Sequence, residues 1–269
     1  TLPQPETEDA PGLPFQLDKY GNPITSVSNT FIAINDSKEF DPIFFDTFKD
    51  QIMLSKSKTI QDHHLTKARI FIETEYHLKN ISREMMRDAI ALKAENNKRN
   101  SLADYLNALV WDETPRIETS FNVLIGTPYD EYNSAVSKNF WLMLAARGLY
   151  PGCKCDNMII LEGSQGDLKS VFLKTIGGDL FKEVRSAMSS KDFCIEISGT
   201  WLASIAELEA MNSAKSIESI KAIITTETDH YRPPYSVYAI DKPRQCVFVG
   251  TTNQETYLND ITGNRRFWP

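Results

Sequence analysis

The chain has 269 residues, 41% of them apolar, and a net charge of −7. This is the composition of a globular protein with room for a sizeable core. The negative charge excludes a protein that coats nucleic acid through bulk positive charge, although loops can still contact it. No apolar run approaches the roughly 18 residues of a membrane span, so we expect a cytoplasmic protein without membrane partners. Cys153 and Cys155 have no His or second Cys pair nearby, so we expect no structural metal.

The first half of the chain is expected to be a tail followed by helices. Residues 1–28 are rich in Pro, Glu and Thr and contain a Gly-Asn-Pro turn, which predicts a linker and an extended arm. Residues 29–150 are expected to form a mainly helical N-terminal region. Ser82 and Ser101 each precede an apolar face with helical spacing, and a further helix is expected to end near Gly148.

From residue 151 the pattern changes to short apolar runs that alternate with helices. NMIILEG, TWLASIAELEA and QCVFVGTTN are the expected strands, and SVFLKTIGG is the helix after the first of them. This alternation predicts an α/β core with a mostly parallel sheet over residues 151–269. The chain stops within an apolar, aromatic stretch, so we expect the core to be truncated at the C-terminus.

The segment LEGSQGDLKS resembles a phosphate-binding loop in which Leu168 stands where the pattern has its second glycine. A loop between a buried strand and a helix start gathers backbone N–H groups and the helix dipole on phosphate. Lys169 would then contact the β- and γ-phosphates, and Ser170 would ligate Mg²⁺. The alternative is a tight strand-to-helix turn made by Gly163 and Gly166.

Three further segments carry residues that an NTPase site uses. Glu207 would act as a general base at the end of the second strand, unless it is an ordinary solvated acid. Asn253 would hold a water against the γ-phosphate, unless it is only a polar strand end. Arg265 or Arg266 would complete a neighbouring subunit's site as an arginine finger, unless the two form a surface pair. Their order after Lys169 favours the NTPase interpretation.

The chain contains the segments HYRPPY, DKPRQCVFVGTTN and TGNRRFWP, and further upstream LDKYGNPITSVSNT and ADYLNALVWDETPRI. These segments, the first three most specifically, resemble the virulence-associated protein E family, replication proteins of phages and mobile islands that are related to superfamily 3 helicases. The resemblance implies a P-loop NTPase core of the AAA+ or superfamily 3 helicase type that uses ATP and Mg²⁺. It further implies a ring-shaped homo-oligomer on single- or double-stranded DNA, with replication proteins as other partners.

The resemblance also implies roles for individual residues. Gly163, Gly166, Lys169 and Ser170 would bind the nucleotide, and Ser170 and Glu207 would hold Mg²⁺ through it. DNA contacts would come from DHYRPPYSVYAIDKPR, where phosphate contact and base stacking are implied for Arg232, Tyr235, Lys242 and Arg244. The alternative interpretation is that Arg232 and the two prolines after it only stabilise the conformation of a loop.

Two positions depart from the family pattern, in the two motifs that would touch Mg-ATP. Leu168 replaces a glycine and would crowd either the β-phosphate or the first helical turn. Ser204 stands where members often have an acid, which would weaken metal binding. One hypothesis is therefore a replication ATPase or helicase with a shifted loop. The second is a catalytically inactive helicase-like module that binds DNA or a replication partner. A third is that Leu168 was introduced to trap a nucleotide-free state.

Overall fold

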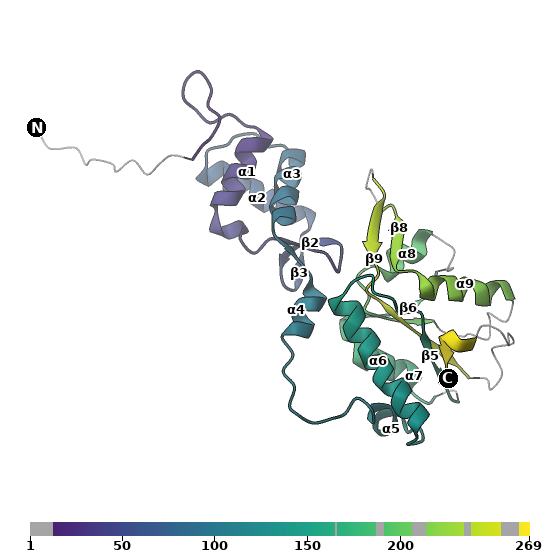
Figure 1. Ribbon diagram of the computed structural model, residues 1–269. Coiled ribbons are helices and arrows are strands. Elements are labelled where there is room, and N and C mark those ends of the chain that lie inside the picture. The colour runs from purple at the N-terminus through teal and green to yellow at the C-terminus, as the bar shows by residue number, and fades with distance from the viewer. Residues whose placement is uncertain (1–12, 165, 187–190, 206–213, 234–237, 254–263) are drawn as a thin grey trace, which may run out of the picture. The chain divides into compact units, whose positions relative to one another are not determined.

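The computed structural model describes residues 13–164, 166–186, 191–205, 214–233, 238–253 and 264–269 (Figure 1). By its internal contacts the chain divides into two compact units, Thr1–Ser101 and Leu102–Pro269. The α/β core is expected from the sequence to start at residue 151, whereas the second unit begins near α4 (Ser101–Asn107) and includes the helices before residue 151. Within the described ranges, no helix is both long and apolar enough to cross a membrane.

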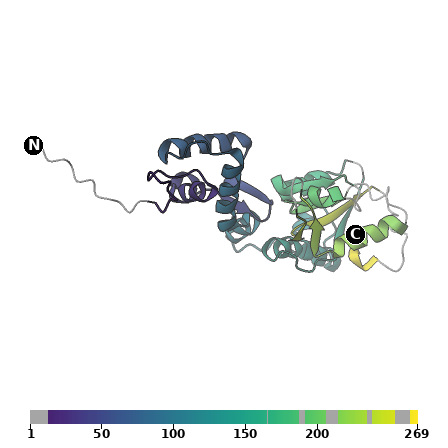
Figure 2. The same ribbon diagram turned by 90° about the horizontal axis from the view of Figure 1, so that it is seen from above.

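The first unit combines helices with a small sheet, shown in purple to blue in Figures 1 and 2. Ser82 caps α3 by accepting a hydrogen bond from the Met85 amide at 3.0 Å, which confirms the expected helix start. The four-stranded sheet, in the order β3-β2-β1-β4, was not expected, because strands of two to five residues are too short to show an alternating pattern. The elements are α1 (Val27–Asp36), η1 (Lys38–Phe40), β1 (Phe44–Asp46), β2 (Gln51–Ser55), β3 (Lys58–Thr59), α2 (Asp62–Glu75), α3 (Arg83–Asn96) and β4 (Lys98–Arg99).

The second unit is built on a five-stranded sheet in the order β11-β5-β10-β7-β6. Every neighbouring pair in it is parallel, which confirms the expected mixed α/β fold with a parallel sheet. The three strands expected from the sequence are β5, β7 and β10, and all of β10 is buried, as a parallel sheet covered on both faces requires. The strands are β5 (Met158–Glu162), β6 (Phe181–Val184), β7 (Leu202–Ile205), β10 (Val247–Thr252) and β11 (Phe267–Trp268).

Helices cover both faces of this sheet. On one face, alternate strand residues such as Ile160 and Phe248 pack against α8 (Lys191–Ile197) and α9 (Ala214–Thr225) in one apolar cluster. On the other, α7 packs on β6 and β7, and α6 packs on β10. The helices on that second face are α5 (Ser120–Ile125), α6 (Glu131–Leu149) and α7 (Lys169–Gly177), followed by η2 (Gly178–Leu180). The result is a three-layer α/β unit.

The order of the strands creates a switch point between β5 and β10. The chain leaves β5 for β6 at one edge of the sheet, whereas it leaves β10 for β11 at the other edge, past β5. The connections from these two neighbouring strands therefore run in opposite directions across the sheet. In open parallel sheets, ligands bind outside the carboxyl ends of the strands, where the direction of the connections reverses.

Candidate functional site

The loop between β5 and α7 lies at this switch point, beside the end of β10. The buried strand ends at Glu162 and the helix begins at Lys169, so the expected strand, loop and helix are confirmed. Gly163 has φ 154° and Gly166 has φ 99°, in a region that residues with a Cβ rarely adopt. A Cβ on Gly163 would also lie 2.7 Å from Oδ2 of Asp167. The loop therefore requires glycine at its start, and the carboxylate of Asp167 packs against it.

Leu168 adopts the left-handed conformation that the missing glycine would supply. It is the residue before α7, with φ 57° and ψ 19°. This conformation costs an L-residue roughly 1–2 kcal/mol. Its side chain is 67% exposed, so it extends into solvent. The Leu168 side chain therefore does not crowd the first helical turn, contrary to expectation. Its cost is instead the strain of a left-handed backbone at a residue other than glycine.

Lys169 links the loop to the end of β10. Its Nζ donates hydrogen bonds to the carbonyl oxygens of Gly163 at 2.6 Å and Ser164 at 3.0 Å. A third bond, of 3.0 Å, goes to Oδ1 of Asn253, which is 84 residues away in the sequence. These bonds use the three donors of the ammonium group on neutral oxygens. The structure thus brings Lys169 and Asn253 together, with Ser170 exposed in the first turn of α7.

A pocket of about 290 Å³ adjoins Lys169 on the face of β5 that carries α5 and α6. Apolar side chains from these elements form most of its wall, and Glu162, Asp167 and Lys169 lie at its polar end. Thr127 and Asn133 add polar groups between α5 and α6. The apolar and remaining lining residues are Phe121, Ile125, Val136, Ile159, Ile160, Leu161 and Pro269.

The acidic motif of the second strand is only partly described. Ser204 lies in β7 between Val249 of β10 and Glu183 of β6, and it is 1% exposed. Its Oγ has no hydrogen-bond partner in the described part of the chain. Glu207 falls in 206–213, outside the described residues, so its expected role stays a prediction.

Arg265 and Arg266 lie at the amino end of the parallel strands, whereas Lys169 follows the carboxyl end of β5. Both belong to η4 (Asn264–Arg266), just before β11, whose Phe267 pairs with Met158 at the start of β5. Asn157 donates to the Arg265 carbonyl at 3.1 Å, which fixes this position. The side chain of Arg265 is exposed there, on the side of the sheet away from the loop of its own chain.

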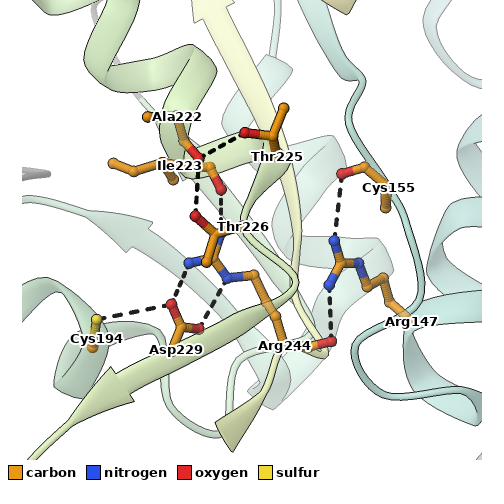
Figure 3. Close-up of polar contacts among 9 residues, drawn as sticks. All are labelled: Arg147, Cys155, Cys194, Ala222, Ile223, Thr225, Thr226, Asp229 and Arg244. Atoms are coloured by element: carbon orange, nitrogen blue, oxygen red, sulfur yellow. Dashed lines mark hydrogen bonds and ion pairs between the residues drawn. The ribbon is translucent and has the colours of Figure 1, made fainter. Parts of the chain in front are cut away.

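Arg244 is buried, contrary to its expected place on a DNA-contacting surface. Figure 3 shows its guanidinium facing Asp229, with Nε donating to Oδ2 at 2.9 Å and Nη2 to Oδ1. Nη1 donates to the carbonyl of Ile223 in α9. The side chains are 3% and 9% exposed. Burial alone would lower the pKa of Arg244, but the hydrogen bonds to Asp229 hold that pKa above its usual value. Arg244 therefore joins the hairpin of β8 (Thr228–Tyr231) and β9 (Ile240–Pro243) to α9, and it is unavailable to nucleic acid.

The rest of the hairpin, β8 (Thr228–Tyr231) and β9 (Ile240–Pro243), has an inner and an outer face. Lys242 lies half-buried on the inner face, where Nζ donates to Oγ of Ser198 at 2.9 Å. His230 and Asp241 pair on the outer face at 2.5 Å. Arg232, which follows β8, is exposed. Tyr235 falls outside the described residues. Of the residues expected to contact DNA, Arg232 is thus the one that the structure describes as exposed.

Of the four cysteines, all in the second unit, Cys246 is buried and Cys153, Cys155 and Cys194 are partly exposed. Burial raises the pKa of Cys246 to about 12, and burial also raises the pKa values of Cys155 and Cys194. The carbonyl of Cys155 accepts a bond from buried Arg147 (Figure 3). Among the described residues, no group of three or more His, Cys, Asp or Glu side chains is arranged to hold a metal ion.

The fold and the site define an α/β protein with a parallel sheet and a glycine-containing loop at its switch point. The profile of the virulence-associated protein E-like domain matches residues 106–269, which is more than half of the chain. The chain therefore belongs to the virulence-associated protein E-like domain family, as its sequence motifs indicate.

The comparison with solved structures supports the fold. The chain is similar to the apo structure of the NrS-1 C-terminal region, with a TM-score of 0.52 and 15% identity over 84% of this chain and 57% of that one. An A-form apo structure of the same region matches with a TM-score of 0.49, 15% identity, and 84% and 56% coverage. The chain thus spans less than two thirds of the length of these matched chains. No protein of curated function matches it.

Proposed function

We propose that the second unit is a P-loop NTPase core of the AAA+ or superfamily 3 helicase type that binds ATP and Mg²⁺ at the loop Gly163–Ser170. The observation that carries this proposal is the meeting of Lys169 with Asn253 at the switch point, where its described contacts are to neutral oxygens. A lysine without a carboxylate partner keeps its full charge for an incoming anion. Phosphate oxygens would replace the loop carbonyls as its acceptors.

The loop geometry supports the same proposal. Gly163 and Gly166 allow the backbone to turn its N–H groups inward, and the helix that follows is nine residues long, so its dipole adds attraction for phosphate. Ser170 offers an exposed hydroxyl in the first turn as a ligand for Mg²⁺ carried by the nucleotide. Glu207 would activate water, and Asn253 would orient it. Bound Mg²⁺ would neutralise charge on the transferred phosphoryl group.

We further propose that the chain works in replication of a phage or mobile element as a ring-forming, helicase-like ATPase. Family membership supports this role. Arg265 lies at the amino end of the strands, away from the loop of its own chain, which supports a role in a neighbouring subunit's site. Exposed Arg232 beside β8 is the described residue that best fits contact with a DNA phosphate.

The direct test is equilibrium binding of Mg-ATP, followed by ATP hydrolysis with and without DNA. The unmodified chain is expected to bind Mg-ATP, and Lys169→Ala is expected to lose at least 10-fold in affinity. Thr74 is exposed on α2 in the first unit, so Thr74→Val is the control and should bind Mg-ATP as the unmodified chain does. Equal affinity for Lys169→Ala and the unmodified chain would overturn the assignment of the loop.

A catalytically inactive module that binds DNA or a replication partner is the second candidate. The observation that favours it is the buried hydroxyl of Ser204, which has no hydrogen-bond partner among the described residues and stands where an acid would help to hold Mg²⁺. In this case ATP hydrolysis would be absent, and Lys169→Ala would leave DNA affinity unchanged. DNA-stimulated hydrolysis by the unmodified chain would exclude it.

A further inference from the structure

The first unit carries lysines that its own carboxylates do not neutralise. Other positive side chains of this unit form ion pairs, as Arg83 does with Asp62. In the part of the chain that the structure describes, no carboxylate pairs with Lys56, Lys58 or Lys67, and all three lysines are exposed. Their positive charge is therefore open to an anion from outside the chain.

These lysines come from a hairpin turn and from the helix that follows it. Ser55 at the end of β2 pairs with Lys58 of β3, so Lys56 lies in the turn between the two strands. On α2, His63 and Lys67 are one helical turn apart and are both exposed, so they share one face of the helix. Two elements thus present basic side chains to solvent.

His64 shows that the hairpin and the helix bring these side chains together. It is a buried residue in the first turn of α2, where its Nδ1 accepts a hydrogen bond from the Gln61 backbone N–H at 2.9 Å. The ring of His63 packs against it, with 3.8 Å between the ring centroids. Burial lowers the pKa of the His64 ring, and so do the neighbouring His63, Lys58 and Lys67. A hairpin lysine and a helix lysine therefore lie near the same buried ring.

The acidic residue in the first turn of α2 is engaged by arginines of α3. Arg83 forms an ion pair with Asp62, and the pKa of Asp62 is lowered by that contact and by the charge of Arg87. It does not pair with the lysines of the hairpin or of α2. Positive groups that stay close together without a carboxylate repel one another. An external anion would relieve this repulsion.

The placement of these groups suits an extended polyanion. The whole chain carries a net charge of −7, so attraction to a polyanion has to come from a local surface. DNA presents one negative charge per about 1.7 Å of its axis, and several basic groups can meet its phosphates at once and release counterions. We call this set of four side chains the basic surface: Lys56, Lys58, His63 and Lys67.

We propose that the basic surface of the first unit binds the phosphate backbone of DNA without reading its sequence. The surface lies outside residues 106–269, which the family profile matches, and outside the hairpin β8–β9 that is expected to contact DNA. Lysine and histidine side chains can donate to phosphate oxygens, which fixes a protein on DNA without a base contact. The inference goes beyond the proposed function, because it requires no nucleotide at the loop between β5 and α7.

The test measures binding of the full chain to a fluorescent DNA duplex by anisotropy at several salt concentrations. The double variant Lys58→Gln with Lys67→Gln should weaken binding about 10-fold and lower the slope of log affinity against log salt by about two. Duplexes of two unrelated sequences should be affected equally. The matched control is Lys38→Gln with Lys79→Gln, which changes the net charge equally at exposed sites of the same unit. It should bind within about 2-fold of the unmodified chain, since it removes no phosphate contact.

Three results would overturn the inference. The first is unchanged DNA binding by Lys58→Gln with Lys67→Gln, and the second is equal weakening by the control, which would mean that net charge alone matters. The third is binding of polyglutamate as tight as that of DNA and lost in the same variant, which would make an acidic polypeptide the partner.

Binding of Mg-ATP separates this inference from the proposed function. Both double variants should bind Mg-ATP as the unmodified chain does, since none of their substitutions lies in the second unit. An unchanged DNA affinity together with normal Mg-ATP binding would overturn the basic surface alone. No binding of Mg-ATP by the unmodified chain, together with the expected loss of DNA affinity, would overturn the nucleotide site alone. Thermal unfolding should show no fall in Tm for Lys58→Gln with Lys67→Gln, because the exchange removes a repulsion.

Discussion

Two positively charged side chains of the second unit have opposite surroundings. Lys169 lies at the carboxyl edge of the sheet and donates to three neutral oxygens. Arg244 lies under the hairpin β8–β9, where it donates to both oxygens of Asp229 and is 3% exposed. The first charge is available to an anionic ligand, whereas the second is neutralised inside the fold. The chemical partner of a basic residue, more than its place in a motif, thus decides whether it binds a ligand.

The largest effect is expected from breaking the buried pair. Asp229→Ala leaves the guanidinium of Arg244 buried without its carboxylate, which should lower the free energy of unfolding by about 3–5 kcal/mol. Urea unfolding followed by circular dichroism measures it. Asp241→Ala, on the outer face of the same hairpin, is the control and should leave stability unchanged, since its side chain is 73% exposed. Equal stability of the two variants would show that the Arg244 pair does not hold the hairpin.

A smaller effect is expected at the exposed end of the hairpin. Arg232→Ala should weaken binding to a DNA oligonucleotide about 3- to 5-fold and reduce the salt dependence of binding by about one phosphate contact. Fluorescence anisotropy at several salt concentrations measures both. Arg185→Ala, at another exposed arginine of the unit, is the control. If Arg185→Ala weakens DNA binding as much as Arg232→Ala does, the contact with DNA is not specific to the hairpin.

The smallest effect is expected in the loop itself. Leu168→Gly removes the cost of a left-handed L-residue and adds the backbone entropy of glycine, so the free energy of unfolding should rise by about 0.5 kcal/mol. Lys174→Gly, within α7, should instead lower it by about 0.5–1 kcal/mol. Thermal unfolding of the pair compares them. A loss of stability in Leu168→Gly would mean that the exposed leucine makes contacts that outweigh its strain.

The contrast also explains what the sequence could predict. The loop and Asn253 were predictable because each follows a continuous apolar run, and parallel strands bring their carboxyl ends to one edge. Arg244 was misplaced because its position depends on Asp229, which reaches it through the pairing of β8 with β9. The strands of two to five residues in the first unit are too short for a periodic signal.

The pocket beside Lys169 could not be predicted from the sequence either. Thr127 and Asn133 lie in and after a short turn whose place beside β5 follows from the packing of α5 and α6, with no motif to mark them. A polar residue in a helix–helix turn is ordinarily a cap, and Asp130 does cap α6. That Oγ1 of Thr127 is buried without a hydrogen-bond partner among the described residues becomes visible only in three dimensions.

The most direct test of the account is the affinity of Mg-ATP for the full chain, measured by calorimetry beside Lys169→Ala and Leu168→Gly. Because Leu168 points into solvent and Lys169 is held at the switch point, the unmodified chain should bind, Leu168→Gly should bind within a few-fold of it, and Lys169→Ala should lose at least 10-fold. Binding by Leu168→Gly alone, or equal binding by Lys169→Ala, would contradict the central claim that this loop, as it stands, is a nucleotide site.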